Sequence, residues 1–259
     1  MKPSRPLLLA GAFASVALAA VLTVAMLRGG RAVDPPCAVR EFEGSRFVVC
    51  AFDATRQELR LASRDAEGDY LRGFERLEDF LGRDARRVRF AMNAGMFNSA
   101  GAPIGLYVAR GDEQHVLRLT EGPGNFHLKP NGVFWLDQTG AVHIDTSDAF
   151  AQAAPQAYWA TQSGPMLVID AAMHPRFAED GESRLTRNGV GVRDAHTAFF
   201  VISSGFVSFG RFARFFRDEL DCDDALFLDG AVSSLWAPAL NRRDDDHALG
   251  PMVVVLDRS

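Results

Sequence analysis

The chain has 259 residues, of which 47% are hydrophobic and 24% charged, values that exclude a disordered chain and a polytopic membrane protein. Its 28 basic and 33 acidic residues leave a formal net charge of −5, which argues against nucleic acid or an anionic membrane surface as a general partner. The length predicts one domain with a sizeable core.

The first 33 residues have the features of an export signal. Basic residues flank an uncharged apolar run over residues 7–27. Such a run is either a cleaved signal peptide or a single membrane anchor that tethers the chain to the inner membrane. Either alternative places the rest of the chain in the periplasm or outside the cell. Residues 34–45 are expected to be a linker, and residues 46–259 the functional domain.

Three cysteines, Cys37, Cys50 and Cys222, occur in a chain that is expected to reach an oxidising compartment. Cys37 and Cys50 flank a short polar connection, so they can close a small loop as a disulfide and leave Cys222 buried and free. Three free thiols are the alternative, because connectivity does not follow from sequence.

The predicted elements, in chain order, are mostly short strands. β-branched and aromatic runs between turn residues predict them at 46–53, 58–63, 88–92, 104–109, 133–136, 158–161, 166–169, 196–203, 225–228 and 251–256. Helical spacing predicts helices at 74–81 and 211–220, and Ser147 can cap a brief third one. The second helix has an apolar stripe that is expected to pack into the core: Phe212, Phe215, Phe216 and Leu220. We therefore predict an α+β single domain with a mixed, mostly antiparallel sheet and a few short helices.

Polar residues stand where several of these apolar strands end, a position from which side chains often reach a ligand. Asn93 ends one strand and is followed by a turn with Gly95, and Ser163-Gly164 ends another. Asn93 can bind sugar hydroxyls or phosphate oxygens, or can satisfy only the turn. Thr161 stands where a serine hydrolase of the Gly-x-Ser-x-Gly type needs glycine, which weakens that assignment for Ser163.

Two further motifs carry charge. Arg187 precedes a glycine-bearing segment with Gly191 and Arg193, and a guanidinium fork with glycines beside it suits phosphate oxygens. Asp229-Gly230 follows an apolar strand, with Ser233 and Ser234 next along the chain. A carboxylate placed there can act as nucleophile or base, or can cap the turn as a structural aspartate.

Other polar residues give weaker indications. His174 and His196 can serve as acid–base groups, but isolated histidines are usually structural or exposed. The run from Asp244 to His247 lies beside two arginines and favours a solvated charged loop over a metal site. No metal site and no cofactor are predicted.

Together the motifs resemble the phosphodiester glycosidase family over roughly residues 46–256. The likeness rests on four segments: Asn93-Ala94-Gly95-Met96-Phe97, Ser163-Gly164-Pro165-Met166-Leu167, Arg187 with Gly189 and Gly191, and Leu228-Asp229-Gly230 with Ser233-Ser234. The chain departs from the family pattern at Ala94, at Asn188-Gly189 and at Ala231-Val232, which predicts a tighter pocket.

The resemblance implies a hydrolase that cleaves the glycosidic C–O bond of a sugar 1-phosphodiester in an envelope or extracellular glycan. It implies Asp229, Arg187 and Asn93 as catalytic residues, with the following residues binding substrate: Gly95, Ser163, Gly164, Gly191, Arg193, Gly230, Ser233 and Ser234. A non-catalytic protein that binds an anionic glycan, and a phosphodiesterase that cuts P–O, remain alternatives. The oligomeric state stays open.

Overall fold

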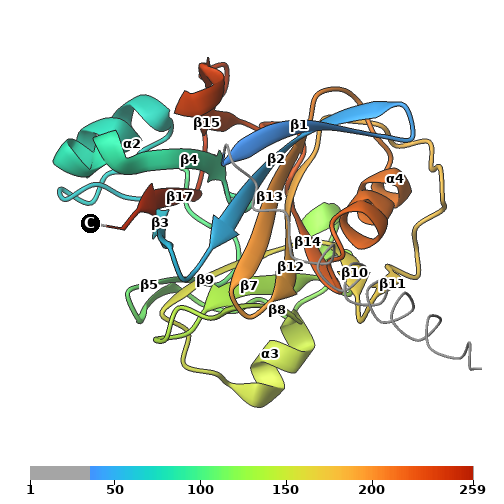
Figure 1. Ribbon diagram of the computed structural model, residues 1–259. Helices are drawn as coiled ribbons and strands as arrows, with labels where there is room; N and C mark the ends of the chain where they lie inside the picture. Colours follow the sequence, from blue (N-terminus) through green and yellow to red (C-terminus); the bar gives the residue numbers. More distant parts are fainter. Residues whose placement is uncertain (1–35, 259) are drawn as a thin grey trace, which may run out of the picture. The chain divides into compact units, whose positions relative to one another are not determined.

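Three β-sheets form the framework of the computed structural model, which describes residues 36–258 (Figure 1). The largest has the strand order β1 (Cys37–Phe42), β2 (Ser45–Asp53), β13 (Thr197–Ser203), β12 (Asn188–Asp194), β14 (Asp224–Asp229), β10 (Met166–Ile169) and β11 (Ala172–Met173). The second has the order β16 (Arg242–Arg243), β15 (Leu235–Ala237), β4 (Val88–Asn93), β17 (Met252–Asp257) and β3 (Gln57–Ala62). The third has the order β6 (Asp112–His115), β5 (Tyr107–Ala109), β9 (Trp159–Ser163), β7 (Gly132–Leu136) and β8 (Val142–Thr146).

The helices between the strands are short. They are α2 (Phe74–Leu81), α3 (Ser147–Ala153) and α4 (Phe209–Arg214), the 3-10 turns η1 (Gly82–Arg87), η2 (Asn125–His127) and η4 (Pro238–Leu240), and a π-helical turn η3 (Phe215–Glu219). The strands pair antiparallel within all three sheets over the described residues. The predicted α+β class, with mostly antiparallel strands and few short helices, is confirmed, and the strands form three sheets where one was expected.

Strand β17 has no polar face because it is covered on both sides. Val253 and Val255 point into the core that the three sheets enclose, whereas Val254 and Leu256 pack on the side of α2. Because successive side chains of a strand point to opposite faces, a strand covered on both sides needs apolar residues at every position. The continuous apolar run near the C-terminus is therefore a central strand, as its pairing with both β3 and β4 requires.

Strands β1 and β2 form a hairpin whose two-residue turn, Glu43-Gly44, has positive φ at both positions, as tight hairpins favour. The hairpin places Cys37 directly opposite Cys50, and the two form a disulfide. Cys222 is a buried free thiol. The predicted cysteine pairing is thus confirmed. The segment 34–45, expected as a linker, contains β1, which pairs with β2 over its whole length.

The helices begin close to the predicted positions, with local differences. Helix α2 ends at Leu81, before Gly82 with its positive φ. Thr146 caps α3 by accepting a hydrogen bond from the Ala149 amide, so Ser147 is the first helical residue and not the cap. The helix expected over 211–220 begins earlier, after a Ser208 cap, and continues from α4 into η3. Its stripe Phe212, Phe215, Phe216 and Leu220 is buried, as predicted.

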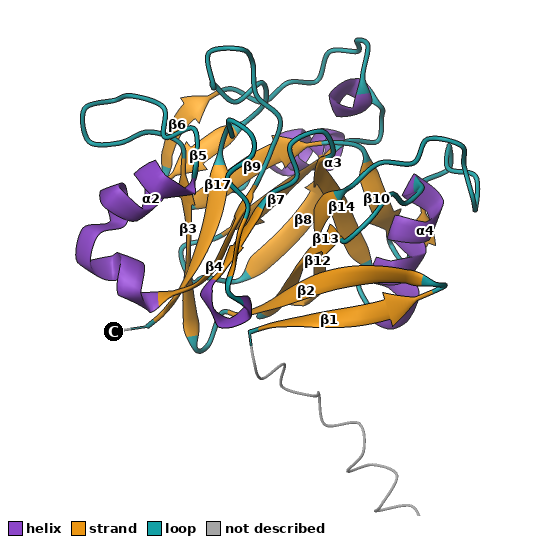
Figure 2. Ribbon diagram, turned by 90° about the horizontal axis from the view of Figure 1, so that it is seen from above, coloured by secondary structure: helices purple, strands orange, loops and turns teal. Residues whose placement is uncertain are grey.

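The hydrophobic core lies between the sheets, and each helix covers an outer face. Helix α4 packs on the seven-stranded sheet through contacts that include Phe212 and Phe227, and α2 packs on β4 and β17 through Phe74. Figures 1 and 2 show α2 and α4 at opposite sides of the sheet assembly. Within residues 36–258 no helix has the length and apolar character needed to cross a bilayer, and the apolar run 7–27 lies outside the described residues.

Candidate active site

Asp229 reaches its position through an irregularity at the end of β14. Asn188 lies opposite Asp229 and Gly189 lies opposite Phe227, so Leu228 is an extra residue on β14. Directly opposed residues of antiparallel strands face the same side, so this bulge turns the Asp229 side chain to the side of Asn188. The Ser163 hydroxyl donates a 2.9 Å hydrogen bond to the Leu228 carbonyl, which holds the bulge against the end of β9.

Asn188 links the ends of two sheets. Its Nδ2 atom donates to the backbone oxygen of Asn93 at 2.7 Å and lies 3.1 Å from Asn93 Oδ1. The Ser234 amide, just before β15, donates to Asn93 Oδ1 at 2.9 Å. Asn93 and Asn188 are both fully buried. Since every one of these contacts ties a strand end, the two asparagines are held in one orientation, and Nδ2 of Asn93 is left without an acceptor.

The Asp229 carboxyl group is almost fully buried, with 7% exposure. Desolvation raises its pKa from the usual 3.8 to about 6, because burial disfavours the charged form. The backbone amides of Gly230 and Val232 and the Asn93 side chain oppose this shift by lowering the pKa. The Gly230 amide donates to Asp229 Oδ1 at 2.6 Å. The site thus holds a carboxyl group that changes its protonation state near pH 6.

Ser233 and Ser234 form the turn that follows Asp229. The Ser233 hydroxyl lies 3.1 Å from both the Asp229 and the Gly230 carbonyl oxygens and 3.4 Å from Asn188 Oδ1. The Ser234 hydroxyl donates to the Val232 carbonyl. Gly230 and Ser233 are partly exposed, whereas Ser234 is buried. Of the residues expected to bind substrate in this turn, Gly230 and Ser233 therefore have a surface that a ligand can reach.

Gly95, Ser163 and Gly164 are packed where β9 meets its neighbours. A Cβ atom on Gly95 would lie 2.8 Å from Thr161 Oγ1, which itself donates to the Ala94 carbonyl. A Cβ atom on Gly164 would lie 2.6 Å from that of Asn131. All three predicted residues are buried and make close protein contacts. They support the backbone behind Asn93 and Asp229.

The structure does not bring Arg187 to these residues. Its guanidinium is fully buried, with Nε donating to the Val207 carbonyl and Nη2 to the Ser183 carbonyl, both at 2.9 Å. It stacks on the Phe209 ring, 3.6 Å from the centroid, on the side of the sheet that α4 covers. Burial lowers its pKa to about 10. Asp229 faces Asn188, so the expected convergence of Asn93, Arg187 and Asp229 applies only to the first and last of these.

Gly191 and Arg193 lie away from the other candidate residues. A Cβ atom on Gly191 would lie 2.5 Å from the Phe216 ring, so this glycine allows η3 to approach β12. The Arg193 guanidinium donates twice to the Leu220 carbonyl at the end of η3. Arg193 is five residues beyond Asn188 on the same strand, a separation of about 17 Å. Both residues thus lie apart from the other candidate residues and contact η3 and Leu220.

Asn188 is the residue of the site whose role the sequence did not reveal. It stood out only as a departure from the family pattern, although a polar residue at the start of a buried strand, beside Gly189, is a usable signal. The two histidines considered earlier lie elsewhere: His174 is buried against Phe177, with its pKa lowered by burial, and His196 is exposed in a turn.

Taken together, the α+β fold and a buried carboxyl group with a raised pKa, fixed beside two amides at the ends of strands, fit a hydrolase. The chain belongs to the phosphodiester glycosidase family, whose model matches residues 86–256. The sequence resemblance stated above is therefore confirmed.

Two known proteins are similar to this chain in sequence or in structure. The chain is 36% identical over 152 residues to an Escherichia coli protein described as uncharacterized protein YigE, an alignment that covers 58% of each chain. A hypothetical protein from Synechocystis has a similar structure, with a TM-score of 0.52 and 16% identity over 86% of this chain and 61% of that one. The present chain thus spans less than two thirds of the length of both relatives.

The catalytic domain of zebrafish N-acetylglucosamine-1-phosphodiester alpha-N-acetylglucosaminidase, auto-inhibited by its pro-peptide, has the same fold. Its TM-score is 0.56 at 10% identity, covering 86% of this chain and 82% of that domain. At this level of identity the similarity establishes the fold alone.

Proposed function

We propose that the protein hydrolyses the glycosidic C–O bond of a sugar 1-phosphodiester and that Asp229 acts on the anomeric centre, as nucleophile or as the base that activates water. The observation that carries the proposal is the Asp229 carboxyl group, buried at the end of β14 beside Asn93 and Asn188, with a pKa raised to about 6. A base whose pKa lies near the operating pH combines adequate basicity with a large ionised fraction.

The leaving group explains why one such carboxylate can suffice. The phosphate of a sugar 1-phosphodiester is weakly basic, so it departs with less help from a general acid than the alcohol of an ordinary glycoside needs. We assign the orienting of the sugar or the phosphate to the partly exposed Ser233 hydroxyl and to the buried Asn93 amide, which also interacts with the Asp229 carboxylate. Asn188 is a positioning residue, because its amide holds Asn93.

For Arg187 we propose a positioning role in place of direct contact with phosphate. Nε and Nη2 hold the segment before β12 against Val207, whereas Nη1 is buried without a partner among the described residues. Because the guanidinium is fully buried, a phosphate could reach it only if the surrounding segment moved. The residue therefore fixes the start of β12, where Asn188 stands. Asn188 in turn sets the position of Asn93.

The natural substrate is proposed to be an envelope or extracellular glycan. The disulfide between Cys37 and Cys50 fits a secreted or periplasmic protein, because such bonds persist in oxidising compartments. Export and tethering through residues 7–27 remain proposals that rest on the sequence.

Hydrolysis in oxygen-18 water tests the reaction. Attack at the anomeric carbon places the label on the released sugar and leaves the phosphate unlabelled, whereas a phosphodiesterase gives the reverse. Asp229→Asn should reduce turnover of a sugar 1-phosphodiester by at least about a hundredfold while substrate still binds, because the carboxylate acts in the transition state. Binding without turnover in the unaltered protein would favour the non-catalytic alternative.

A matched control is available on the same strand. Asp224 begins β14, is also partly buried, and has a pKa raised by desolvation. Asp224→Asn keeps an oxygen that can accept from the Asp170 amide, as Oδ1 of Asp224 does at 3.2 Å. It should leave turnover nearly unchanged. Equal losses in the two variants would point to a general effect on folding and would remove Asp229 from the mechanism.

A further inference from the structure

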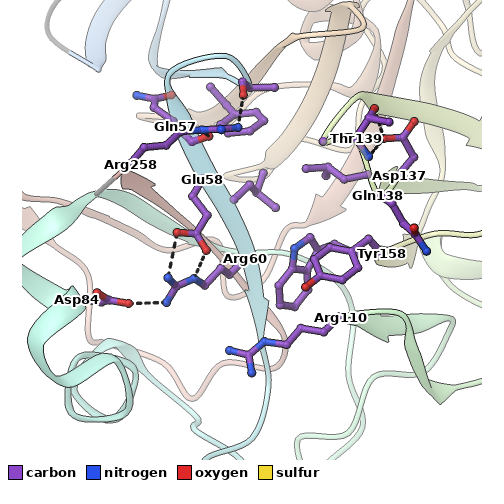
Figure 3. A pocket seen from close by; sticks show the side chains of 16 residues that line it. Gln57, Glu58, Arg60, Asp84, Arg110, Asp137, Gln138, Thr139, Tyr158 and Arg258 are labelled. Carbon is purple, nitrogen blue, oxygen red and sulfur yellow. Dashed lines mark hydrogen bonds and ion pairs between the residues drawn. The ribbon is translucent and has the colours of Figure 1, made fainter.

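Two adjoining cavities follow the edge strand β3, away from the Asp229 carboxylate. The first, of about 510 Å³, lies between β3, the turn after β7 and the start of β9 (Figure 3). The second, of about 650 Å³, is also lined by Arg60, Asp84, Arg110 and Trp159, so the two form one groove. Neither is lined by Asn93, Asn188 or Asp229.

The groove runs along the strand toward the end of the sheet that carries Asn93. Its lining follows β3 and the residue after it, from Gln57 to Ser63, a length on the order of 20 Å. Gln57 lies opposite Asp257, at the far end of β17, whereas Ala62 lies opposite Met252, which is itself opposite Asn93. The groove is thus long enough for a chain and not only for a single small molecule.

The charges of the groove leave arginines available to a ligand. Arg60 pairs with Glu58 at 2.6 Å and with Asp84 at 2.8 Å, as the dashed lines in Figure 3 mark. Arg87 pairs with the same two carboxylates, so two arginines neutralise them within the protein. Arg258 donates only to the carbonyl oxygens of Gln57 and Ala54. The exposed Arg110 has no hydrogen bond or ion pair to any residue in 36–258. The first cavity therefore has two arginines without a carboxylate partner in the described part of the chain, Arg110 and Arg258. Its remaining carboxylate, Asp137, accepts hydrogen bonds from Thr139 and from the Ala141 amide.

An aromatic surface accompanies these charges. Tyr158 is 38% exposed, packs edge-to-face on Trp159, and lies beside Arg110 in Figure 3. Gln138 and Thr139 bring polar side chains to the same cavity, and the Ser63 hydroxyl in the second is buried without a partner. A flat amphipathic ring with hydrogen-bonding groups around it suits the apolar face and hydroxyls of a sugar, and the arginines suit an attached carboxylate or phosphate.

We propose that this groove binds an anionic oligosaccharide chain, as a second site that holds the polymer while its phosphodiester reaches Asp229. The second half of this statement rests on the proposed function, whereas the binding does not. A polynucleotide carries a charge at every phosphate and needs a broadly basic face, whereas the first cavity offers only two arginines without a carboxylate partner within residues 36–258, Arg110 and Arg258. The charged side chains Glu58 and Arg60 weigh against an added peptide strand, because charges on an edge strand oppose such pairing.

Calorimetric titration of the full chain tests the proposal. The probes are hexagalacturonate, a phosphodiester-linked mannose oligomer of similar length, neutral cellohexaose, hexaglutamate and a short oligothymidylate. We expect the acidic oligosaccharides to bind at least about tenfold more tightly than cellohexaose, and the first two probes to distinguish a carboxylate from a phosphate. Equal binding of cellohexaose, or equal or tighter binding of hexaglutamate or the oligothymidylate, would overturn the assignment to an anionic glycan.

Variants place the binding in the groove. Arg110→Gln and Tyr158→Ala should each weaken binding of the acidic oligosaccharide at least about fivefold. Arg46→Gln, which removes an exposed arginine of β2 that lines neither cavity, should leave it unchanged. All three should turn over a small sugar 1-phosphodiester at the unaltered rate. If Arg110→Gln binds as tightly as Arg46→Gln, the groove is not the site. If the protein binds the oligosaccharide but hydrolyses no phosphodiester, the proposed function is refuted, whereas the proposal that the groove binds an anionic oligosaccharide is retained.

Discussion

Asp229 is held in the fold in a way that makes its ionised form costly. Its pKa is about 6 in the folded protein against the usual 3.8, so the folded state retains a proton between these values that the unfolded state has lost. Stability contributed by this group therefore falls as the pH rises from about 4 to 6, and the loss above pH 6 amounts to about 3 kcal/mol. Arginine-paired carboxylates such as Glu58, whose pKa is lowered, act in the opposite sense.

Comparison of Asp229→Asn with the unaltered protein isolates this effect. Asparagine carries no charge to desolvate, so the variant should be more stable at pH 8 by up to about 3 kcal/mol, and the difference should vanish near pH 4. Urea unfolding at both values measures it. Activity of the unaltered protein should fall below about pH 6, as the base takes up its proton. A variant that is less stable at pH 8 than at pH 4, relative to the unaltered protein, would contradict the assigned pKa.

At the scale of elements, we expect Arg187 to support the candidate site by fixing the start of β12, without contacting the ligand. Arg187→Ala leaves the Ser183 carbonyl without its donor and leaves the Val207 carbonyl with only the 3.3 Å hydrogen bond from the Leu185 amide. It should therefore lower the free energy of unfolding by about 2 kcal/mol or more and reduce turnover with it. Arg187→Lys should recover part of both. Inhibition by inorganic phosphate should change little in either variant.

One outcome would contradict the positioning role proposed for Arg187. A folded Arg187→Ala protein with unaltered stability and strongly weakened phosphate inhibition would restore the direct contact that the sequence suggested. The phosphate measurement is the decisive one, because a purely structural change would not be expected to move it selectively.

The local pattern predicts elements better than it predicts where their side chains point. Continuous apolar runs identified β14 and β17, and the stripe around Phe212 identified the helix that covers the large sheet. The bulge at Leu228 has no sequence signal of its own, yet it determines that Asp229 faces Asn188. Arg187 stands one residue before Asn188 and contacts a different set of residues, so nearness in sequence misled the prediction for the arginine.

For the whole molecule, the sequence predicts the α+β fold class but not the arrangement of the strands into three sheets. Short antiparallel strands are read from alternation, but which strands share a sheet depends on contacts between distant segments, such as β2 beside β13. Strand β1 was not predicted, because its polar, partly exposed residues resemble those of a linker. The separation of the groove along β3 from Asp229 likewise appears only once the strand order is known.

The disulfide gives the last prediction, at this same scale. It joins the first described strand to the second, with a sequence separation of 13 residues. A loop of this size restricts the unfolded chain, so loss of the bond should lower the free energy of unfolding by about 2 to 3 kcal/mol. Urea unfolding with and without reductant should reveal that decrease in the unaltered protein, and a Cys37→Ser, Cys50→Ser double variant should match the reduced protein in both conditions. Turnover at low urea should persist in all of them, because Cys50 pairs with Phe200 and not with a residue of the candidate site. Equal stability with and without reductant would mean that the bond contributes nothing to the fold, and reductant sensitivity of the double variant would trace the effect to something other than this bond.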